Sequence, residues 1–481
     1  MTTQEAKNRL VRTLSHELQE ENLALFAGAG LSAPAGFVNW VELLRPIAEE
    51  LELDIEKEKT DLVALAQYHC NANAANRSKL NQLLIDNFCK DVEITSNHRI
   101  LSRLPISTYW TTNYDKLLET SLTNVGKSPD VKYTRKQLTH TKPRRDAIIY
   151  KMHGDVEHPS EAVLTKDDYE RYHLKMQPFI NALSGDLTSK TFLFLGFSFT
   201  DPNLDYILSR VRIAYDNHQR QHHCILRNIQ RSICDDDADF EYQKRKQGLF
   251  VQDLLRFGIK SFMVDSFEEI TEILESVEKQ YRRNTVFISG AAHDYSPRTD
   301  EDSNKFVSNL SKEVIESGFN IVSGFGLGIG SSVITGALEH IYMKGGSIRN
   351  DQLVLRPFPQ HLAGNQDLKE IWTEYRKDML SFSGIAIFVF GNKVVDGKTE
   401  LSNGMREEFE IAREKGLFLL PIGATGYMAK ELWDEVNSDF ETFNGSVPQK
   451  IKDYFVALGD ENISFKDMFE NVMKLLFELK K

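Results

Sequence analysis

The sequence predicts an α/β protein made of two Rossmann-like domains with largely parallel sheets, the first of which carries a helical insertion. Short apolar segments typical of buried strands alternate with segments of helical periodicity along most of the 481 residues. This alternation is the pattern of parallel strands joined by helices. A chain of this length is also too long for one ordinary core. Because the alternation restarts after a polar segment at 278–284, we expect domains at 1–283 and 284–481.

The first half contains six predicted strands, recognised as short apolar runs. They lie near 23–27, 107–111, 147–152, 191–196, 223–227 and 260–264. Residues from about 41 to 103 separate the first two strands; they are rich in Leu, Ala, Glu, Lys, Asn and Gln and show little strand character. We interpret this stretch as a helical insertion that lies over the sheet and shapes a pocket.

The second half repeats the alternation of strands and helices without an evident sequence repeat. A predicted helix surrounds Phe306, Val307, Leu310 and Val314. The predicted strands lie at 285–289, 320–323, 352–356, 385–390 and 418–421. The second half is therefore expected to form its own Rossmann-like sheet.

The overall charge excludes some classes of partner. A net charge of -12 argues against a general nucleic-acid binder or a binder of anionic membranes, because both need a broad basic face. The first 22 residues are polar, with Leu10 and Leu14 at helical spacing, and lack the apolar core of a signal peptide. The most apolar runs, at 191–199 and 384–390, are far shorter than the roughly 20 residues that span a bilayer. We expect a cytoplasmic protein with no membrane contact.

The four cysteines are scattered. Cys70, Cys89, Cys224 and Cys234 form no C-x-x-C pair. Neither a zinc ribbon nor a disulfide framework is indicated, so we expect no zinc and no other bound metal.

A glycine-containing turn follows the first strand. Gly28, Ala29, Gly30 and Ser32 lie between that strand and a predicted helix start. Glycines permit a tight turn, and unpaired amides at a helix start attract the oxygens of a pyrophosphate. The alternative is a plain strand-to-helix connection without a ligand. A dehydrogenase would place an acidic residue on a strand about 20 positions later, whereas the sequence around Glu49 is helical, which argues against hydride transfer.

Three polar segments follow later predicted strands, at 112–115, 151–154 and 196–198. Asn113 has the groups to orient a ribose hydroxyl or a water, and Asp115 has the charge to steady a developing cation. His153 is suited to act as a general base near neutral pH. The alternatives are a structural histidine and a turn stabilised by the side chains of Asn113 and Asp115.

Together, and in this order, the four segments resemble the motifs of sirtuins, over about residues 20 to 265. The resemblance implies cleavage of the bond between nicotinamide and ribose in NAD+. It implies that His153 and Asn113 are catalytic. It further implies an NAD+ site formed by Gly28, Ala29, Gly30, Ser32, Asn113, Asp115, His153, Gly196 and Ser198.

The chain departs from protein-deacetylating sirtuins at two places. It lacks their zinc module with two C-x-x-C pairs, and residues 37–40 read Phe-Val-Asn-Trp where the family has a D-F-R stretch. Without that module and its peptide groove, water becomes the favoured acceptor. We therefore expect an NAD+ nucleosidase that forms ADP-ribose and nicotinamide, with NAD+ as substrate and no further cofactor. A protein deacylase and a catalytically silent nucleotide-binding regulator stay open as alternatives.

The second half carries two glycine turns after strands, at 289–291 and 323–331, which offer amides to phosphate. Arg376, Lys393 and Glu408 flank a later strand, where two cations would meet phosphates and a carboxylate would meet ribose hydroxyls. Ordinary solvated charges are the alternative.

This half resembles the SLOG family of nucleotide-binding domains. The segment 402–408 keeps only a glycine and a downstream glutamate of the motif used by catalytic relatives, so binding without catalysis is expected. Ala291 stands where a serine would offer a further hydroxyl. The resemblance implies a signal-binding site made of Gly290, Leu327, Gly328, Arg376, Lys393, Gly404 and Glu408.

A zinc-less sirtuin half joined to a SLOG half resembles the effector family of the Thoeris anti-phage defence system. The resemblance implies that a partner TIR-domain protein, ThsB, makes a cyclic ADP-ribose isomer. Binding of this activator to the SLOG half would open an NAD+ pocket held closed by the helical insertion, and the cell would lose its NAD+. It also implies a homotetramer, to which the segment around Leu10 and Leu14 is a candidate contributor.

Overall fold

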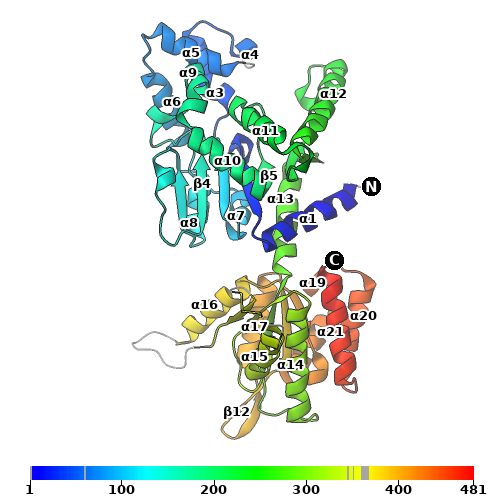
Figure 1. The fold of residues 1–481 in the computed structure, drawn as a ribbon. Helices are drawn as coiled ribbons and strands as arrows, with labels where there is room; N and C mark the ends of the chain where they lie inside the picture. Colours follow the sequence, from blue (N-terminus) through cyan, green and yellow to red (C-terminus); the bar gives the residue numbers. More distant parts are fainter. Residues whose placement is uncertain (1–2, 59–60, 344–345, 350–351, 359–367, 481) are drawn as a thin grey trace. The chain divides into compact units, whose positions relative to one another are not determined.

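The computed structural model describes residues 3–58, 61–343, 346–349, 352–358 and 368–480. The chain divides into two compact units, Met1–Glu278 and Lys279–Lys481 (Figure 1). The division falls within helix α13 (Glu268–Arg282), just before the boundary expected at 283/284. Each unit has its own parallel sheet and its own core, so the predicted class of two Rossmann-like α/β domains is confirmed.

Unit 1 contains a seven-stranded parallel sheet with the order β3-β4-β2-β1-β5-β6-β7. The six predicted strands are present. The sequence analysis missed β3, a four-residue edge strand that starts with Pro-Asp, two residues that strands usually avoid. The strands are β1 (Leu23–Ala27), β2 (Thr108–Thr111), β3 (Pro129–Lys132), β4 (Ala147–Lys151), β5 (Thr191–Leu195), β6 (His222–Arg227) and β7 (Ile259–Val264).

The strand order reverses at β1. The chain runs from β1 to β2 on one side, and β5 then pairs with β1 on the other side. Because such crossovers are right-handed, the helices of the two directions cover opposite faces, and a crevice opens at the carboxyl end of β1. Helices accordingly flank the sheet (Figure 1). They are α1 (Thr3–Gln19), α2 (Ala29–Ser32), α8 (Leu117–Asn124), α9 (Lys166–Lys175), α10 (Gln177–Ser189), α11 (Pro202–Tyr215), α12 (Asp237–Leu254) and α13.

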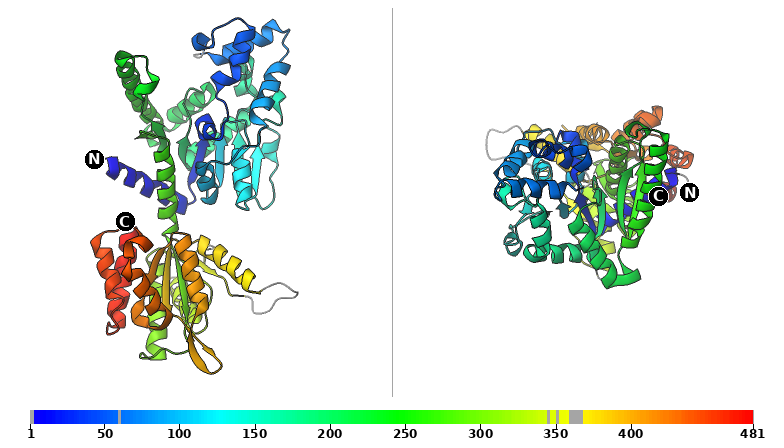
Figure 2. Two further views of the ribbon diagram at one scale, coloured as in Figure 1. Left: turned by 180° about the vertical axis from the view of Figure 1, so that it is seen from behind. Right: turned by 90° about the horizontal axis from the view of Figure 1, so that it is seen from above.

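The expected insertion is helical; its first four helices gather at one end of the sheet, whereas the last, α7 (Ser96–Arg103), packs against α8 beside the sheet (Figures 1 and 2). It has its own apolar cluster, in which Leu44, Ile47 and Leu65 pack against Tyr114 and Leu164 of the sheet domain. Side chains of Asn39, Asp61 and Thr95 cap three of the helices by accepting backbone N–H groups. The helices are α3 (Trp40–Glu50), α4 (Ile55–Glu58), α5 (Leu62–Ala72), α6 (Ser78–Phe88) and α7 (Ser96–Arg103).

Helix α1 buries its apolar stripe inside its own unit. Leu10 and Leu14 are 6% and 0% exposed, and α1 packs against β1 and β7. The sequence analysis suggested that the segment around these leucines contributes to a homotetramer. Both side chains are instead buried in unit 1, so they are not free to contact another copy of the chain. Their helical spacing reflects the apolar face with which α1 packs into the core of unit 1.

Unit 2 contains a five-stranded parallel sheet with the order β10-β9-β8-β11-β14, again reversing at its first strand. All five strands agree with the predicted ones. They are β8 (Thr285–Ala291), β9 (Asn320–Ser323), β10 (Leu353–Leu355), β11 (Ile385–Phe390) and β14 (Phe418–Pro421). The helices are α14 (Asp300–Glu316), α15 (Gly330–Met343), α16 (Leu368–Ser381), α17 (Asn403–Glu414), α18 (Tyr427–Ser438), α19 (Phe440–Asn444), α20 (Gln449–Ala457) and α21 (Phe465–Lys480).

A hairpin after β11 is absent from the prediction. Strands β12 (Asn392–Val395) and β13 (Lys398–Leu401) pair antiparallel. Asp396 and Gly397 form the turn with φ values of 50° and 78°. An Asp-Gly pair between short strands is a known hairpin signal, so the sequence did contain the information.

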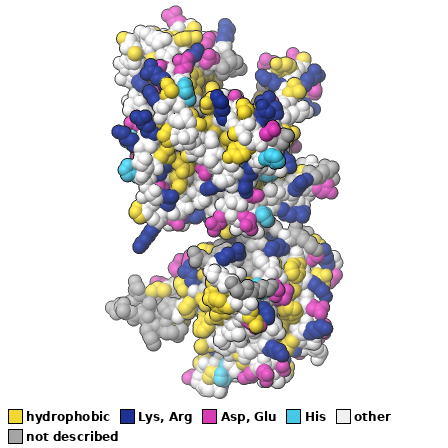
Figure 3. Space-filling view, in the orientation of Figure 1, with side chains coloured by type: hydrophobic (Ala, Val, Ile, Leu, Met, Phe, Trp, Pro, Cys, Tyr) yellow, Lys and Arg dark blue, Asp and Glu magenta, His cyan; other side chains and the backbone are white. Residues whose placement is uncertain are grey.

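Within the described part of the chain, no helix is long and apolar enough to cross a membrane. In the space-filling view, basic and acidic side chains are interspersed on the visible face of each unit (Figure 3).

Candidate functional site

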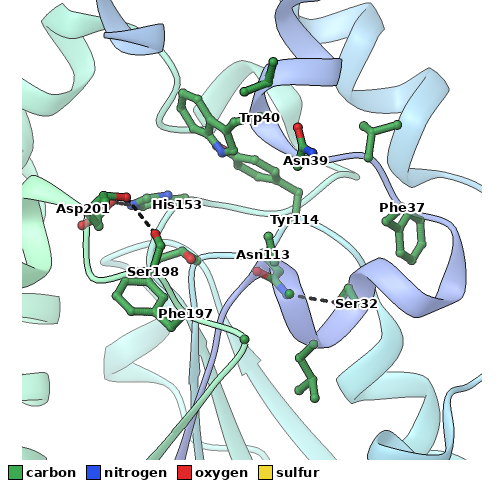
Figure 4. A pocket seen from close by; sticks show the side chains of 18 of the residues that line it. Ser32, Phe37, Asn39, Trp40, Asn113, Tyr114, His153, Phe197, Ser198 and Asp201 are labelled. Carbon is green, nitrogen blue, oxygen red and sulfur yellow. Dashed lines mark hydrogen bonds and ion pairs between the residues drawn. The ribbon is translucent and has the colours of Figure 1, made fainter. Parts of the chain in front are cut away.

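A cavity of about 1190 Å³ opens in unit 1 at the carboxyl ends of β1, β2, β5 and β6. It lies at the reversal of strand order, where open α/β sheets bind ligands. Its volume exceeds the roughly 300–1,000 Å³ of ordinary ligand pockets and leaves room for a dinucleotide. The lining includes Ala29, Gly30, Ser32, Trp40, Asn113, Tyr114, Asp115, His153, Lys166, Tyr169, Gly196, Ser198, Asp201 and Arg227. Asn113 and His153 thus face one shared cavity (Figure 4).

The glycines of the first turn bring two loops into backbone contact. Gly30 donates its N–H to the carbonyl of Gly196 at 2.9 Å, and Gly28 donates to Leu195 at 2.9 Å. A Cβ on Gly28 would lie 2.4 Å from the Gly196 oxygen. Gly196 itself has φ +63°, and a Cβ there would lie 2.1 Å from the nitrogen of Leu31. These glycines are therefore needed for packing, whatever they bind, and Gly28 is not among the residues that line the cavity.

The amide of Asn113 is oriented by the protein. Its Nδ2 donates to the carbonyl of Gly28 and to Oγ of Ser32, both at 3.0 Å. Figure 4 shows the nitrogen turned toward Ser32. Both donors are thereby used, so the carbonyl oxygen Oδ1 is the group that Asn113 offers to a ligand.

His153 is backed by a carboxylate that the sequence analysis did not identify. Its Nε2 lies 3.0 Å from Oδ2 of Asp201, a close contact that does not meet the criteria for a hydrogen bond. Its Nδ1 is buried and has no hydrogen-bond partner. Tyr169 donates its hydroxyl to the same Asp201 oxygen at 3.2 Å. Burial disfavours the charge of Asp201, but His153 and these hydrogen bonds outweigh it and lower the pKa of this carboxyl group.

Asp115 keeps one carboxylate oxygen unused. Oδ1 accepts the N–H of Leu117 at 2.9 Å, whereas Oδ2 is buried without a hydrogen-bond partner. The carboxylate therefore has a structural contact through Oδ1 and a buried Oδ2 whose capacity to accept a hydrogen bond is unused. Ser198, another predicted ligand, is exposed and shares a 2.7 Å hydrogen bond with Thr200.

Two basic side chains, Lys166 and Arg227, occur among the described residues that line the cavity. Arg227 lies at the end of β6 with its guanidinium 4.2 Å from the ring centre of Phe267. Aromatic side chains at the start of the insertion and just before it, Trp40 and Phe37, also line the cavity. The cavity lining therefore combines polar groups with apolar side chains, as ligand sites generally do.

A much smaller cavity, of about 150 Å³, lies at the carboxyl ends of β8 and β9 in unit 2. It is lined by four of the predicted signal-binding residues, Gly290, Arg376, Gly404 and Glu408. Its volume is below that of ordinary ligand pockets, so a nucleotide would have to widen it.

Arg376 is paired with carboxylates of α17. Its Nη1 lies 2.8 Å from Oε2 of Glu407, and its Nε lies 3.5 Å from Oε1 of Glu408. The guanidinium also stacks on Phe358 at 4.7 Å. Glu408 accepts the hydroxyl of Ser289 at 2.5 Å. Burial raises the pKa of Glu408, although Ser289 and Arg376 act in the opposite direction.

The other three predicted residues do not line this cavity. Leu327 and Gly328 lie on the loop after β9, where their carbonyls accept the N–H of Ala292 and the hydroxyl of Tyr295. The Leu327 side chain is 85% exposed. Lys393 lies on strand β12 of the hairpin.

Four relatives match the chain over nearly its whole length. The chain is 52% identical over 466 residues to "NAD(+) hydrolase ThsA" of Bacillus cereus (strain MSX-D12), covering 97% of each chain. It is 49% identical to the protein of the same name from Acinetobacter baumannii (strain 532279), covering 97% of this chain and 98% of the relative. The chain belongs to the ThsA family.

Two family models agree with the two units of this ThsA-family chain. Residues 107–251 match the SIR2-like domain, and residues 269–479 match the Sir2- and TIR-associating SLOG family. "Defense-associated sirtuin 2" of Bacillus subtilis is 25% identical over 209 residues, covering 42% of this chain and 20% of the relative. The resemblance drawn from the motifs is thereby confirmed at the level of family and domains.

The sequence motifs did not identify the partners of these side chains in this ThsA-family member. Asp201 begins helix α11 as its N-cap, and the Asp-Pro pair was a readable helix-start signal. Its contact with His153 depends on β4 and β5 being aligned through the sheet, which local sequence does not encode. Among His, Cys, Asp and Glu of the described residues, no group of three or more is arranged to hold a metal ion.

Proposed function

We propose that this ThsA-family member hydrolyses NAD+ to ADP-ribose and nicotinamide in the unit 1 cavity. The observation that carries the proposal is that Asn113 and His153 line the same cavity, with His153 backed by Asp201. The relatives named NAD(+) hydrolase support the choice of substrate.

In this mechanism His153 accepts a proton from water through Nδ1, the ring nitrogen that does not contact Asp201. The water oxygen bonds to C1′ of the ribose, and the bond from C1′ to the nicotinamide nitrogen breaks. The electron pair of that bond stays on nicotinamide, which leaves as a neutral base. Asp201 beside Nε2 stabilises the imidazolium that forms.

Two further groups act on the sugar. The Oδ1 atom of Asn113 accepts a hydrogen bond from a ribose hydroxyl and fixes the sugar relative to His153. Oδ2 of Asp115, buried and unpartnered, stabilises the positive charge that develops on the ribose as nicotinamide departs. The backbone amides of Ala29 and Ser32, the backbone of Gly196 and the side chain of Ser198 would border the remainder of the dinucleotide.

We propose that unit 2 binds the activator, a cyclic ADP-ribose isomer made by a TIR-domain partner, ThsB. Arg376 would meet its phosphates and Glu408 its ribose hydroxyls, while Leu327, Gly328 and Lys393 would join the site as it widens. Activation in a cytoplasmic homotetramer would then deplete NAD+ during phage infection. The SLOG match and the name of the Bacillus subtilis relative support this role.

The test is nicotinamide release from NAD+ by the purified full-length chain, with and without a cyclic ADP-ribose isomer. We expect release by the wild type when the isomer is present, and a loss of at least about 100-fold in Asn113→Ala. Release that requires an acylated peptide would instead indicate a deacylase. No release under any condition would indicate a silent regulator.

A further inference from the structure

A lysine is buried directly behind the proposed catalytic groups. Lys151 is the last residue of β4 and is 0% exposed. Its ammonium lies 2.7 Å from the carbonyl of Asp115, 3.1 Å from that of Tyr114, 3.0 Å from Oε1 of Glu119 and 2.5 Å from Oδ2 of Asp155. It is not among the residues that line the cavity, so it has no direct contact with a ligand there.

The charge of this lysine is held in place by its partners. Burial disfavours the ammonium, but Glu119 and Asp155 outweigh it and raise the pKa of Lys151. The partners of Lys151 therefore favour its charged form. A buried cation of this kind is rigid, because any movement would separate it from two carboxylates in a medium of low dielectric constant.

The partners belong to different segments. The two carbonyls lie immediately after Asn113, in the turn that follows β2. Asp155 lies two residues after His153, in the loop that follows β4. One further hydrogen bond, from the N–H of Val156 to the carbonyl of Tyr114 at 3.2 Å, joins the same two segments. Glu119 lies on α8, which carries neither proposed catalytic group.

We propose that Lys151 is a positioning residue for NAD+ cleavage, which sets the separation of Asn113 and His153 by tying the turn after β2 to Asp155. The inference rests on the proposed function, since it concerns the groups assigned to that reaction. A displacement of about 1 Å between such groups costs on the order of 100-fold in rate.

Two nearly isosteric variants separate positioning from general stability. Asp155→Asn and Glu119→Gln each remove one negative charge from the partners of Lys151. Of these two residues, only Asp155 lies in the loop after β4 that also carries His153. In Asp155→Asn we expect kcat to fall roughly 10-fold to 100-fold with KM for NAD+ within about twofold. In Glu119→Gln we expect kcat within about twofold, while both variants lower the thermal midpoint to a similar degree.

Crystal structures of the two variants supply a readout that needs no activity. We expect the separation of Asn113 and His153 to change in Asp155→Asn and to stay as in the wild type in Glu119→Gln. Equal effects of the two variants on kcat, an effect on KM alone, or an unchanged separation in Asp155→Asn would overturn the role of Lys151. A wild type that releases no nicotinamide would instead contradict the proposed function, and the structures would still decide whether Lys151 sets the geometry.

Discussion

The crevices of unit 1 and unit 2 occupy the same topological position, yet they differ in volume and in the pairing of the groups proposed to act there. In unit 1, a cavity of about 1190 Å³ is lined by residues with buried polar atoms that have no hydrogen-bond partner, Nδ1 of His153 and Oδ2 of Asp115. In unit 2, a cavity of about 150 Å³ contains a cation, Arg376, already paired with Glu407. Unmet acceptors suit a site that stabilises charge formed during a reaction. A paired cation suits a site where a ligand must displace an internal partner.

The largest effect on nicotinamide release is expected when the proposed catalytic base of unit 1 is removed. His153→Ala should lower nicotinamide release by about 100-fold to 10,000-fold, since it removes the proposed base. Binding of a cyclic ADP-ribose isomer to the chain, measured by calorimetry, should not change. His158→Ala is the matched control, because His158 is exposed and stacks on Tyr133 outside the cavity lining. Full activity in His153→Ala would refute the assignment of the base.

A smaller effect is expected at the second crevice. Arg376→Gln should raise the concentration of isomer needed for half-maximal activation by roughly 10-fold to 150-fold, because a hydrogen bond to a charged group contributes about 1.5–3 kcal/mol. Lys377→Gln, an exposed neighbour on α16, should leave the concentration unchanged. An unaltered activation curve in Arg376→Gln would show that the ligand binds elsewhere.

Removing the charge of Glu407, the internal partner of Arg376, should have the opposite effect on the isomer concentration needed for activation. Glu407→Gln keeps a group able to accept from Thr373 but removes the charge that competes with a phosphate. Because Glu407 is about one-third exposed, we expect up to about a fivefold decrease in the isomer concentration for half-maximal activation, corresponding to at most about 1 kcal/mol. Glu410→Gln on the same helix serves as control. A weaker response in Glu407→Gln would contradict competition.

The smallest effect concerns acid sensitivity, where the two crevices should differ in sign. The pKa of Asp201 is lowered in the fold, so its contribution to stability is present above about pH 4 and is lost as the pH falls through the folded pKa. Asp201→Asn should therefore lower the free energy of unfolding, measured in urea, by a constant amount from pH 7 to 5 and by less in acid. Asp205→Asn, an exposed neighbour on α11, is the control.

For Glu408 the pKa is raised, so its contribution is present below about pH 4 and is lost as the pH rises through the folded pKa. Glu408→Gln mimics the protonated form. Its stability relative to the wild type should therefore increase as the pH rises from 4 to 8. The same slope for Asp201→Asn and Glu408→Gln would remove the contrast between the two carboxylates.

The sequence predicted those elements whose signal is local. Apolar strands such as 191–195 and the motif residues Asn113 and His153 are readable because buried strands are continuous apolar runs and the motifs end them. Edge strand β3 was missed because it is short and polar, and the β12–β13 hairpin was missed although its Asp-Gly turn is a local signal. Contacts across the sheet, such as Asp201 with His153 and Lys151 with Asp115, depend on strand order and had no sequence signal.

The backbone contact between the turn after β1 and the loop after β5 has a consequence for mutational surveys. Gly28, Gly30 and Gly196 leave no space for a methyl group, since added carbons would meet backbone atoms within 3 Å. In a saturation library these positions will score as intolerant even if they never touch a dinucleotide. Asn113 and His153 will score in the same way for a different reason. Only a screen that records protein abundance separately from turnover will distinguish disrupted packing at these glycines from a loss of catalysis.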